Sequence, residues 1–152
     1  MFFSETAPTR YVIPGIVKAV TAPLILIADD NRDTREMYAL YLGMVGYSVE
    51  TAAEGREAIV KALTLRPDLI VMDLQMPGVD GWRAMQDIRA DPKTANIPIV
   101  VLTGHDFKDH LKQSALAAGA RSFLLKPCLP EQLAREISEY VPTRQNRAAS
   151  AS

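Results

Sequence analysis

The stretch DLIVMDLQMPGVDGW, residues 68–82, joins an apolar run to a charged residue and then to a turn. Leu69–Met72 is unbroken apolar sequence, which is typical of a strand buried on both faces of a sheet. Asp73 follows at once, and a proline and two glycines then turn the chain. Because an isolated carboxylate is costly to bury, its position needs a reason. Asp73 is either a cap or chance polar residue at a strand end, or a reactive or metal-binding group at a sheet edge.

Short apolar runs alternate with amphipathic segments on both sides of this stretch. The other predicted strands are Leu24–Ala28, Tyr47–Thr51, Ile97–Leu102 and Ser122–Leu125. Five helices are predicted. The first begins after a cap at Asn31 or Asp33, and the third follows the turn before Trp82. The second, fourth and fifth are Glu54–Leu65, Phe107–Ala118 and Glu131–Tyr140. Strict alternation with short connections predicts an α/β fold: a doubly wound, five-stranded parallel sheet with helices on both faces. In the first helix, the apolar residues that recur at the spacing of one helix face are Met37, Leu40, Tyr41 and Met44.

Composition limits the class of protein. The 152 residues are 48% hydrophobic and 23% charged, with a formal net charge of -1, which is typical of a soluble globular domain. We therefore expect no direct nucleic-acid binding and no membrane association. The single cysteine is compatible with a cytoplasmic protein. We divide the chain into an N-terminal extension (1–22), a folded domain (23–141) and a flexible C-terminal tail (142–152).

Five polar side chains follow the predicted strands at their carboxyl ends: Asp29, Asp30, Asp73, Thr103 and Lys126. Ligands of open α/β sheets bind outside this edge of the sheet. Singly, each residue has a structural explanation, such as a cap, a turn or a surface lysine. Together, on the ends of four strands, they predict a functional site.

Charge balance indicates what such a site would hold. Two like charges about 4 Å apart repel by roughly 4 kcal/mol near a protein surface, so three carboxylates need counter-charge. Lys126 supplies only one positive charge. Mg²⁺, which prefers a few carboxylate oxygens together with phosphate, would supply the rest. A carboxylate, a hydroxyl, an ammonium and Mg²⁺ suit phosphoryl transfer to Asp73, with Thr103 bonding a phosphoryl oxygen.

The motifs LILIADDNRDTREM, DLIVMDLQMPGVDG, IVVLTG and SFLLKP, in this order, resemble the receiver domain of two-component response regulators. The resemblance covers residues 24 to about 141. It implies a flavodoxin-like sheet of order 2-1-3-4-5, counted from the strand at Leu24, and a cis Lys126–Pro127 bond. The implied roles are phosphoryl acceptor for Asp73, Mg²⁺ ligands for Asp29, Asp30, Asp73 and the Gln75 backbone carbonyl, phosphate contacts for Thr103 and Lys126, and a conformational switch for Thr103 and Phe123.

Two positions are individual to this chain. The resemblance places Gln75 and His105 where they would tune dephosphorylation by flanking the path of attacking water. His105 is equally well explained as an exposed turn residue. The switch residue is Phe123 rather than a tyrosine, so it carries no hydroxyl group. The resemblance gives no account of the N-terminal extension.

We interpret the chain as a receiver, either stand-alone or excised from a longer protein, that accepts a phosphoryl group from a histidine kinase or histidine phosphotransfer protein. It would catalyse only its own phosphorylation and dephosphorylation, and its output would be contact with an unknown protein partner. A homodimer through the last two helices and the last strand is one form of such contact. One alternative is a receiver-like interaction module that needs no phosphorylation. Another is a haloacid dehalogenase-type phosphatase, which would need an aspartate where Gln75 stands.

Overall fold

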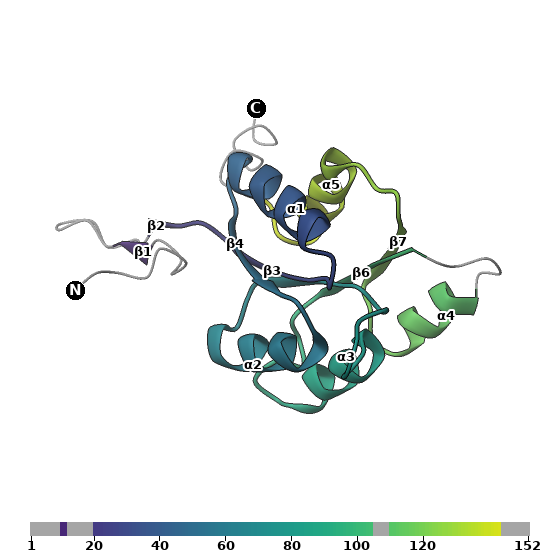
Figure 1. Ribbon diagram of the computed structural model, residues 1–152. Coiled ribbons are helices and arrows are strands. Elements are labelled where there is room, and N and C mark those ends of the chain that lie inside the picture. Colours follow the sequence, from purple (N-terminus) through teal and green to yellow (C-terminus); the bar gives the residue numbers. More distant parts are fainter. Residues whose placement is uncertain (1–9, 12–19, 105–109, 144–152) are drawn as a thin grey trace.

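A five-stranded parallel sheet forms the centre of the computed structural model, which describes residues 10–11, 20–104 and 110–143 (Figure 1). Its strands are β3 (Leu24–Ala28), β4 (Ser48–Ala52), β5 (Leu69–Met72), β6 (Ile99–Thr103) and β7 (Ser122–Leu125). They are ordered β4-β3-β5-β6-β7. This is the predicted order 2-1-3-4-5, so the fold prediction is confirmed.

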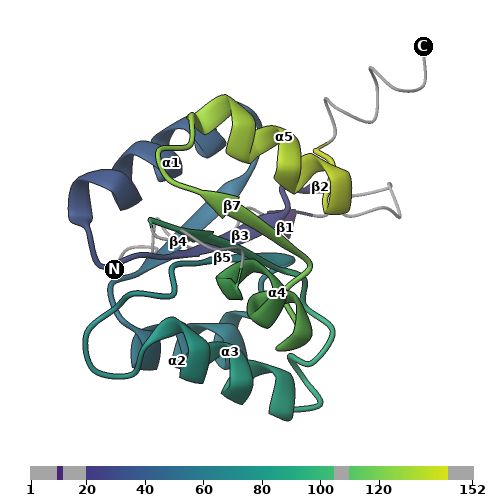
Figure 2. The same ribbon diagram turned by 90° about the vertical axis from the view of Figure 1, so that its right-hand side faces the viewer.

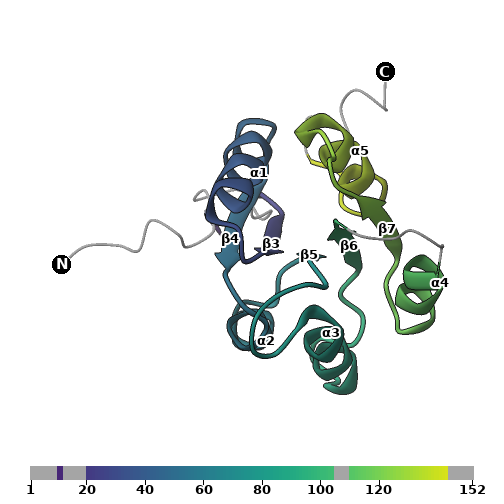
Figure 3. The ribbon, with the colours of Figure 1, turned by 45° about the vertical axis from the view of Figure 1, so that its right-hand side comes forward.

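Helices cover both faces of the sheet. They are α1 (Arg32–Met44), α2 (Gly55–Leu65), α3 (Gly81–Ala90), α4 (His110–Ala117) and α5 (Pro130–Tyr140). Figure 3 shows α1 and α5 on one face and α2, α3 and α4 on the other. Residues 105–109, where the fourth helix was predicted to begin, lie outside the described residues. No helix in the described ranges is long and apolar enough to cross a membrane.

A separate pair of short strands precedes the sheet. In it β1 (Arg10–Tyr11) pairs antiparallel with β2 (Val20–Thr21). Because each strand has only two residues, periodicity in the sequence could not predict them.

The central strand β5 divides the hydrophobic core in two. All four of its residues are buried, as the unbroken apolar run predicted. Ile70 and Met72 pack with the side of the core that includes α2 and α3, while Leu69 and Val71 pack with the side that includes α1 and α5. This is the two-residue alternation of a strand with both faces covered.

The apolar stripe that the sequence indicates on α1 is not the buried face of this helix. Met37, Leu40 and Met44 are 44%, 69% and 72% exposed, whereas Tyr38 and Leu42 are buried. Two apolar stripes overlap on this helix, because Tyr38 and Leu42 are also spaced as neighbours on one face. Periodicity alone does not choose between two such stripes. The contacts of α1 with α5 and the sheet choose the second one.

Local signals fix where the helices begin. The Asn31 side chain accepts a hydrogen bond from the Thr34 backbone N–H at 2.9 Å, which selects Asn31 over Asp33 as the cap of α1. The Asp80 side chain caps α3 in the same way through the Arg83 N–H at 2.9 Å. Since α1 and α3 follow Asp29–Asp30 and Asp73 respectively, these caps also help to define the loops that carry the carboxylates.

Gly81 allows the first turn of α3 to lie directly against the end of β5. A Cβ atom at this position would collide with the Asp73 carbonyl group and the Leu74 backbone. At Gly43, on the exposed side of α1, a Cβ atom would meet nothing within 4 Å. The two helical glycines therefore differ in their surroundings.

We expect Gly81→Ala to lower the free energy of unfolding by about 2 kcal/mol, because backbone atoms must shift to admit the methyl group. Gly43→Ala is the matched control and should raise that free energy by up to about 1 kcal/mol, since alanine is the better helix former. Equilibrium urea unfolding measures both. Equal stability of the two variants would contradict the close approach of α3 to Asp73.

Candidate functional site

Three carboxylates meet at the carboxyl ends of two neighbouring strands. Asp29 and Asp30 follow β3, and Asp73 follows β5, which pairs with β3. Oxygens of all three side chains lie within 4.8 Å of one another. Asp29 and Asp73 are only 3% and 5% exposed, whereas Asp30 faces solvent. The sheet thus gathers the acidic residues that sequence reasoning had placed at its edge.

Lys126 bridges two of these carboxylates through its ammonium group. It follows β7, and its Nζ atom lies 2.6 Å from Asp29 Oδ2 and 3.1 Å from Asp73 Oδ2. Burial disfavours the charged ammonium, but the hydrogen bond to Asp29 and the negative charges of Asp73 and Asp29 outweigh that effect and raise the pKa of Lys126. The Lys126–Pro127 bond is cis, as predicted.

The two oxygens of Asp73 have different partners. Oδ1 accepts a hydrogen bond from Thr103 Oγ1 at 3.1 Å and another from the Gln75 backbone N–H at 3.0 Å. Within the described residues, Oδ2 accepts a hydrogen bond only from the Lys126 ammonium. Neutral donors therefore hold one oxygen, while a cation on a long side chain holds the other.

The donor set of this cluster fits a hard divalent cation. Three carboxylates and one ammonium leave two negative charges uncompensated within the cluster, and every available acidic ligand atom is an oxygen. Mg²⁺ prefers such oxygen ligands and retains several water molecules. Asp30 is exposed, so water can reach the cluster from that side. Asp29, Asp30 and Asp73 are therefore the residues that could hold it.

Residues 25–138 match the family model for the response regulator receiver domain. The chain belongs to this family. As a receiver domain it is similar to the DNA-binding dual master transcriptional regulator RpaA of Synechocystis, with 38% identity over 115 residues that cover 74% of this chain and 47% of the relative. The probable transcriptional regulator ycf27 of Cyanidium caldarium is 37% identical, with 82% and 49% covered. The chain thus spans about half the length of the curated relatives it matches.

Solved receiver structures agree with the fold. CheY4 of Vibrio cholerae, a chemotaxis response regulator, has a TM-score of 0.74 and 36% identity, covering 80% of this chain and 100% of the other. The receiver domain of the sensor histidine kinase PA1611 of Pseudomonas aeruginosa has a TM-score of 0.73 and 30% identity, covering 80% and 99%. That structure has a magnesium ion coordinated in its active site cleft.

The two expected switch residues of this receiver lie on neighbouring strands. Thr103 is fully buried at the end of β6, and Phe123 on β7 is partly buried against the core. Phe123 is in register with Val101, two residues before Thr103. Since side chains two residues apart share a face of the sheet, Thr103 and Phe123 lie on the same face. His105 lies outside the described residues.

Sequence reasoning missed two residues of α1 that bond to the loops of the site. The Arg35 guanidinium donates to the Asp29 carbonyl oxygen at 2.8 Å, and the Tyr38 hydroxyl donates to the Cys128 carbonyl oxygen at 2.6 Å. A tyrosine in a helix that packs on a sheet needs a partner for its hydroxyl group when it is buried. That requirement was a usable signal for Tyr38, but the sequence did not name the partner.

Repulsion among the carboxylates predicts that Asp30 serves metal binding rather than folding. We expect Asp30→Ala to weaken Mg²⁺ binding at least about tenfold, while the free energy of unfolding in metal-free buffer stays constant or rises by up to about 1 kcal/mol. Calorimetric Mg²⁺ titration and urea unfolding measure the two effects. Asp33→Ala, also an exposed acid, should leave Mg²⁺ affinity unchanged. Marked destabilisation of the metal-free Asp30 variant would instead make Asp30 a structural residue.

Proposed function

We propose that this receiver accepts a phosphoryl group on Asp73 from a phosphohistidine of a histidine kinase or histidine phosphotransfer protein, with Mg²⁺ bound. The observation that carries the proposal is the arrangement around Asp73. Its buried carboxylate lies beside Asp29 and Asp30, and Lys126, Thr103 and the Gln75 N–H all donate to it. Membership of the receiver family supports the same chemistry.

In the proposed reaction, a carboxylate oxygen of Asp73 attacks the phosphorus atom. A P–O bond forms while the P–N bond to the donor imidazole breaks, and the imidazole leaves with the electron pair. Mg²⁺, held by Asp29, Asp30, Asp73 and the Gln75 backbone carbonyl, would supply positive charge beside the phosphoryl oxygens.

Lys126 and Thr103 have groups that can follow the transferred charge. The Lys126 ammonium, now on Asp73 Oδ2, would bond to a phosphoryl oxygen. The Thr103 hydroxyl would leave Asp73 Oδ1 for another phosphoryl oxygen. Gln75 and His105 would tune the later hydrolysis by shaping access of water to the phosphorus atom. The Gln75 side chain is exposed beside Asp73, which supports that role.

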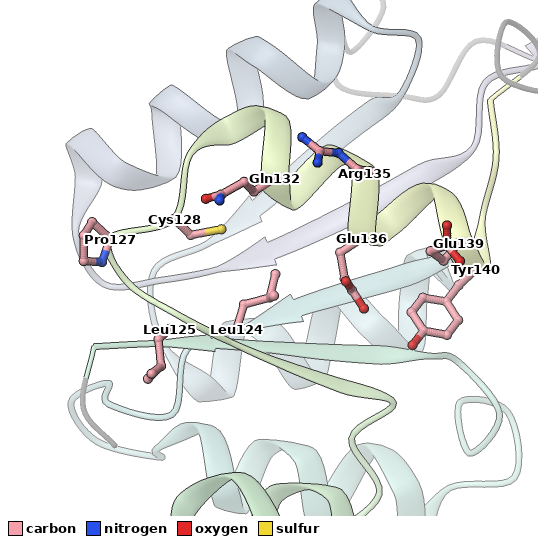
Figure 4. A pocket seen from close by; sticks show the side chains of 9 residues that line it. All are labelled: Leu124, Leu125, Pro127, Cys128, Gln132, Arg135, Glu136, Glu139 and Tyr140. Atoms are coloured by element: carbon pink, nitrogen blue, oxygen red, sulfur yellow. The ribbon is translucent and has the colours of Figure 1, made fainter. Parts of the chain in front are cut away.

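The output face of the receiver is proposed to be the surface of α4, β7 and α5, which Figure 2 turns toward the viewer. A groove of about 670 Å³ lies here between β7 and α5, lined among others by Leu124, Leu125, Arg135, Glu136 and Tyr140 (Figure 4). Leu125 is exposed, and so is Leu116 on α4. A downstream protein or a second copy of the chain would bind this surface, which combines leucines with charged side chains. The relatives named as transcriptional regulators are compatible with an output that controls transcription as part of a longer protein.

Asp73 should gain the mass of one phosphoryl group during incubation with acetyl phosphate, and only when Mg²⁺ is present. Asp73→Asn should remain folded but unmodified, because the amide is a poor nucleophile. Asp87→Asn, which removes an exposed acid on α3, should be modified like the wild type. Mass spectrometry of the intact protein measures all three. Labelling of the Asp73 variant at the wild-type level would refute the assignment of the acceptor.

The proposed output predicts where a phosphoryl mimic changes the structure. Beryllofluoride with Mg²⁺ should shift amide NMR signals of residues 103–126 more than those of residues 47–65, since Thr103 and Phe123 link the site to β7 and α4. Thr103→Ala should reduce this difference, whereas Thr103→Ser, which keeps the hydroxyl group, should retain it. Equal shifts in both regions, or shifts confined to the loop after Asp73, would rule out this face as the output.

A further inference from the structure

Helix α1 contacts both loops that carry the charged groups of the site. Arg35 donates to the Asp29 carbonyl oxygen, which lies in the peptide that joins the acidic pair Asp29–Asp30. Tyr38 donates to the Cys128 carbonyl oxygen, two residues after Lys126. Arg35 and Tyr38 are three residues apart on a helix and so lie on the same face of α1. One helix face therefore bonds to the acidic loop and to the lysine loop.

These two loops are otherwise joined mainly through the groups that react. They follow β3 and β7, which are not neighbours in the sheet because β5 and β6 lie between them. Within the described residues, the hydrogen bond that joins the two loops directly runs from the Lys126 ammonium to Asp29. In Figure 3 α1 and α5 lie side by side above the sheet, so α1 reaches both loops from one face.

We propose that Arg35 and Tyr38 are positioning residues: Arg35 orients the Asp29–Asp30 pair for Mg²⁺, and Tyr38 holds the loop of Lys126 so that its ammonium reaches Asp73. The effect of Tyr38 on the rate of reaction rests on the proposed phosphorylation of Asp73, whereas its effect on the Lys126 loop does not. The part concerning Arg35 rests on metal binding alone. Residues that orient the metal ligands through hydrogen bonds commonly control metal affinity. Small displacements of a reacting group can slow a reaction strongly.

The two residues are predicted to have different effects. Arg35→Met retains a long, unbranched apolar side chain but removes the N–H donors of the guanidinium group. It should raise the Mg²⁺ dissociation constant roughly tenfold. Tyr38→Phe removes only the hydroxyl group. It should leave Mg²⁺ affinity within about twofold of wild type but lower the rate of phosphorylation by acetyl phosphate at saturating Mg²⁺ roughly tenfold.

The chain contains a matched control for each variant. Tyr47 is also a buried tyrosine. Its hydroxyl donates to the Val141 carbonyl oxygen at 2.7 Å, just after the C-terminal end of α5. Tyr47→Phe should therefore cost similar stability but leave phosphorylation at the wild-type rate. Arg32→Met removes one positive charge from the same helix and should leave Mg²⁺ affinity unchanged. Within the described residues, the Arg32 side chain forms an ion pair only with the exposed Glu36, at 3.0 Å.

Hydrogen exchange tests the role of Tyr38 without phosphorylation. The Lys126 backbone N–H donates to the Thr103 carbonyl oxygen at 2.8 Å. If Tyr38 holds this loop, the Lys126 amide should exchange at least about tenfold faster in Tyr38→Phe than in Tyr47→Phe, because only the first variant frees the loop locally. The comparison between the two variants removes the contribution of lower global stability.

Each part of the inference can fail by itself. Wild-type Mg²⁺ affinity in Arg35→Met, or an equal loss in Arg32→Met, would overturn the role of Arg35. Equal Lys126 exchange and equal phosphorylation in Tyr38→Phe and Tyr47→Phe would reduce Tyr38 to a packing residue. If the wild type accepted no phosphoryl group while the exchange and Mg²⁺ effects appeared as expected, the proposed function would fail and the positioning by α1 would stand.

Discussion

The bridge that the Lys126 ammonium makes between Asp29 and Asp73 is the interaction on which the site depends. Each of these carboxylates is almost fully buried, so each would be strongly unfavourable without a partner. One lysine partly neutralises both and joins the loops after β3, β5 and β7. The third acid, Asp30, lies exposed beside them, so the cluster presents three carboxylates that could hold a further cation.

The order of the sheet makes this bridge geometrically possible. Parallel strands place all their carboxyl ends at one edge, and right-handed crossovers bring β3, β5 and β6 together at the centre. The buried run Leu69–Met72 anchors β5, while Gly81 lets α3 begin directly against Asp73. Strands β3, β5, β6 and β7 therefore each contribute apolar residues to the core and polar groups to the site at their carboxyl ends.

The sequence was sufficient where a feature depends on local pattern. The carboxyl ends of the strands, to within one residue, could be predicted from it, and so could the positions of the polar residues of the site at those ends. The sheet order followed instead from the resemblance to the receiver family. The inner face of α1 could not, because two apolar stripes overlap and only long-range packing selects Tyr38 and Leu42. The partner of Tyr38 was equally hidden, since a hydrogen bond to a carbonyl group 90 residues away has no local signature. The roles of the site residues remain predictions.

The two oxygens of Asp73 explain how a local charge could reach β7 if Asp73 is phosphorylated. A phosphoryl group adds negative charge and new acceptor oxygens, and the cluster has few donors to satisfy them. The Lys126 ammonium is carried on a long, flexible side chain, so it could shift to a phosphoryl oxygen with little movement of the backbone. Thr103 is fully buried on a short side chain, so a new bond to a phosphoryl oxygen would draw the end of β6 toward that oxygen. That movement would open space on the sheet face it shares with Phe123, whose ring carries no hydroxyl group that must find a partner. Thr103, rather than Lys126, is therefore the residue through which the charge would change the shape of the surface.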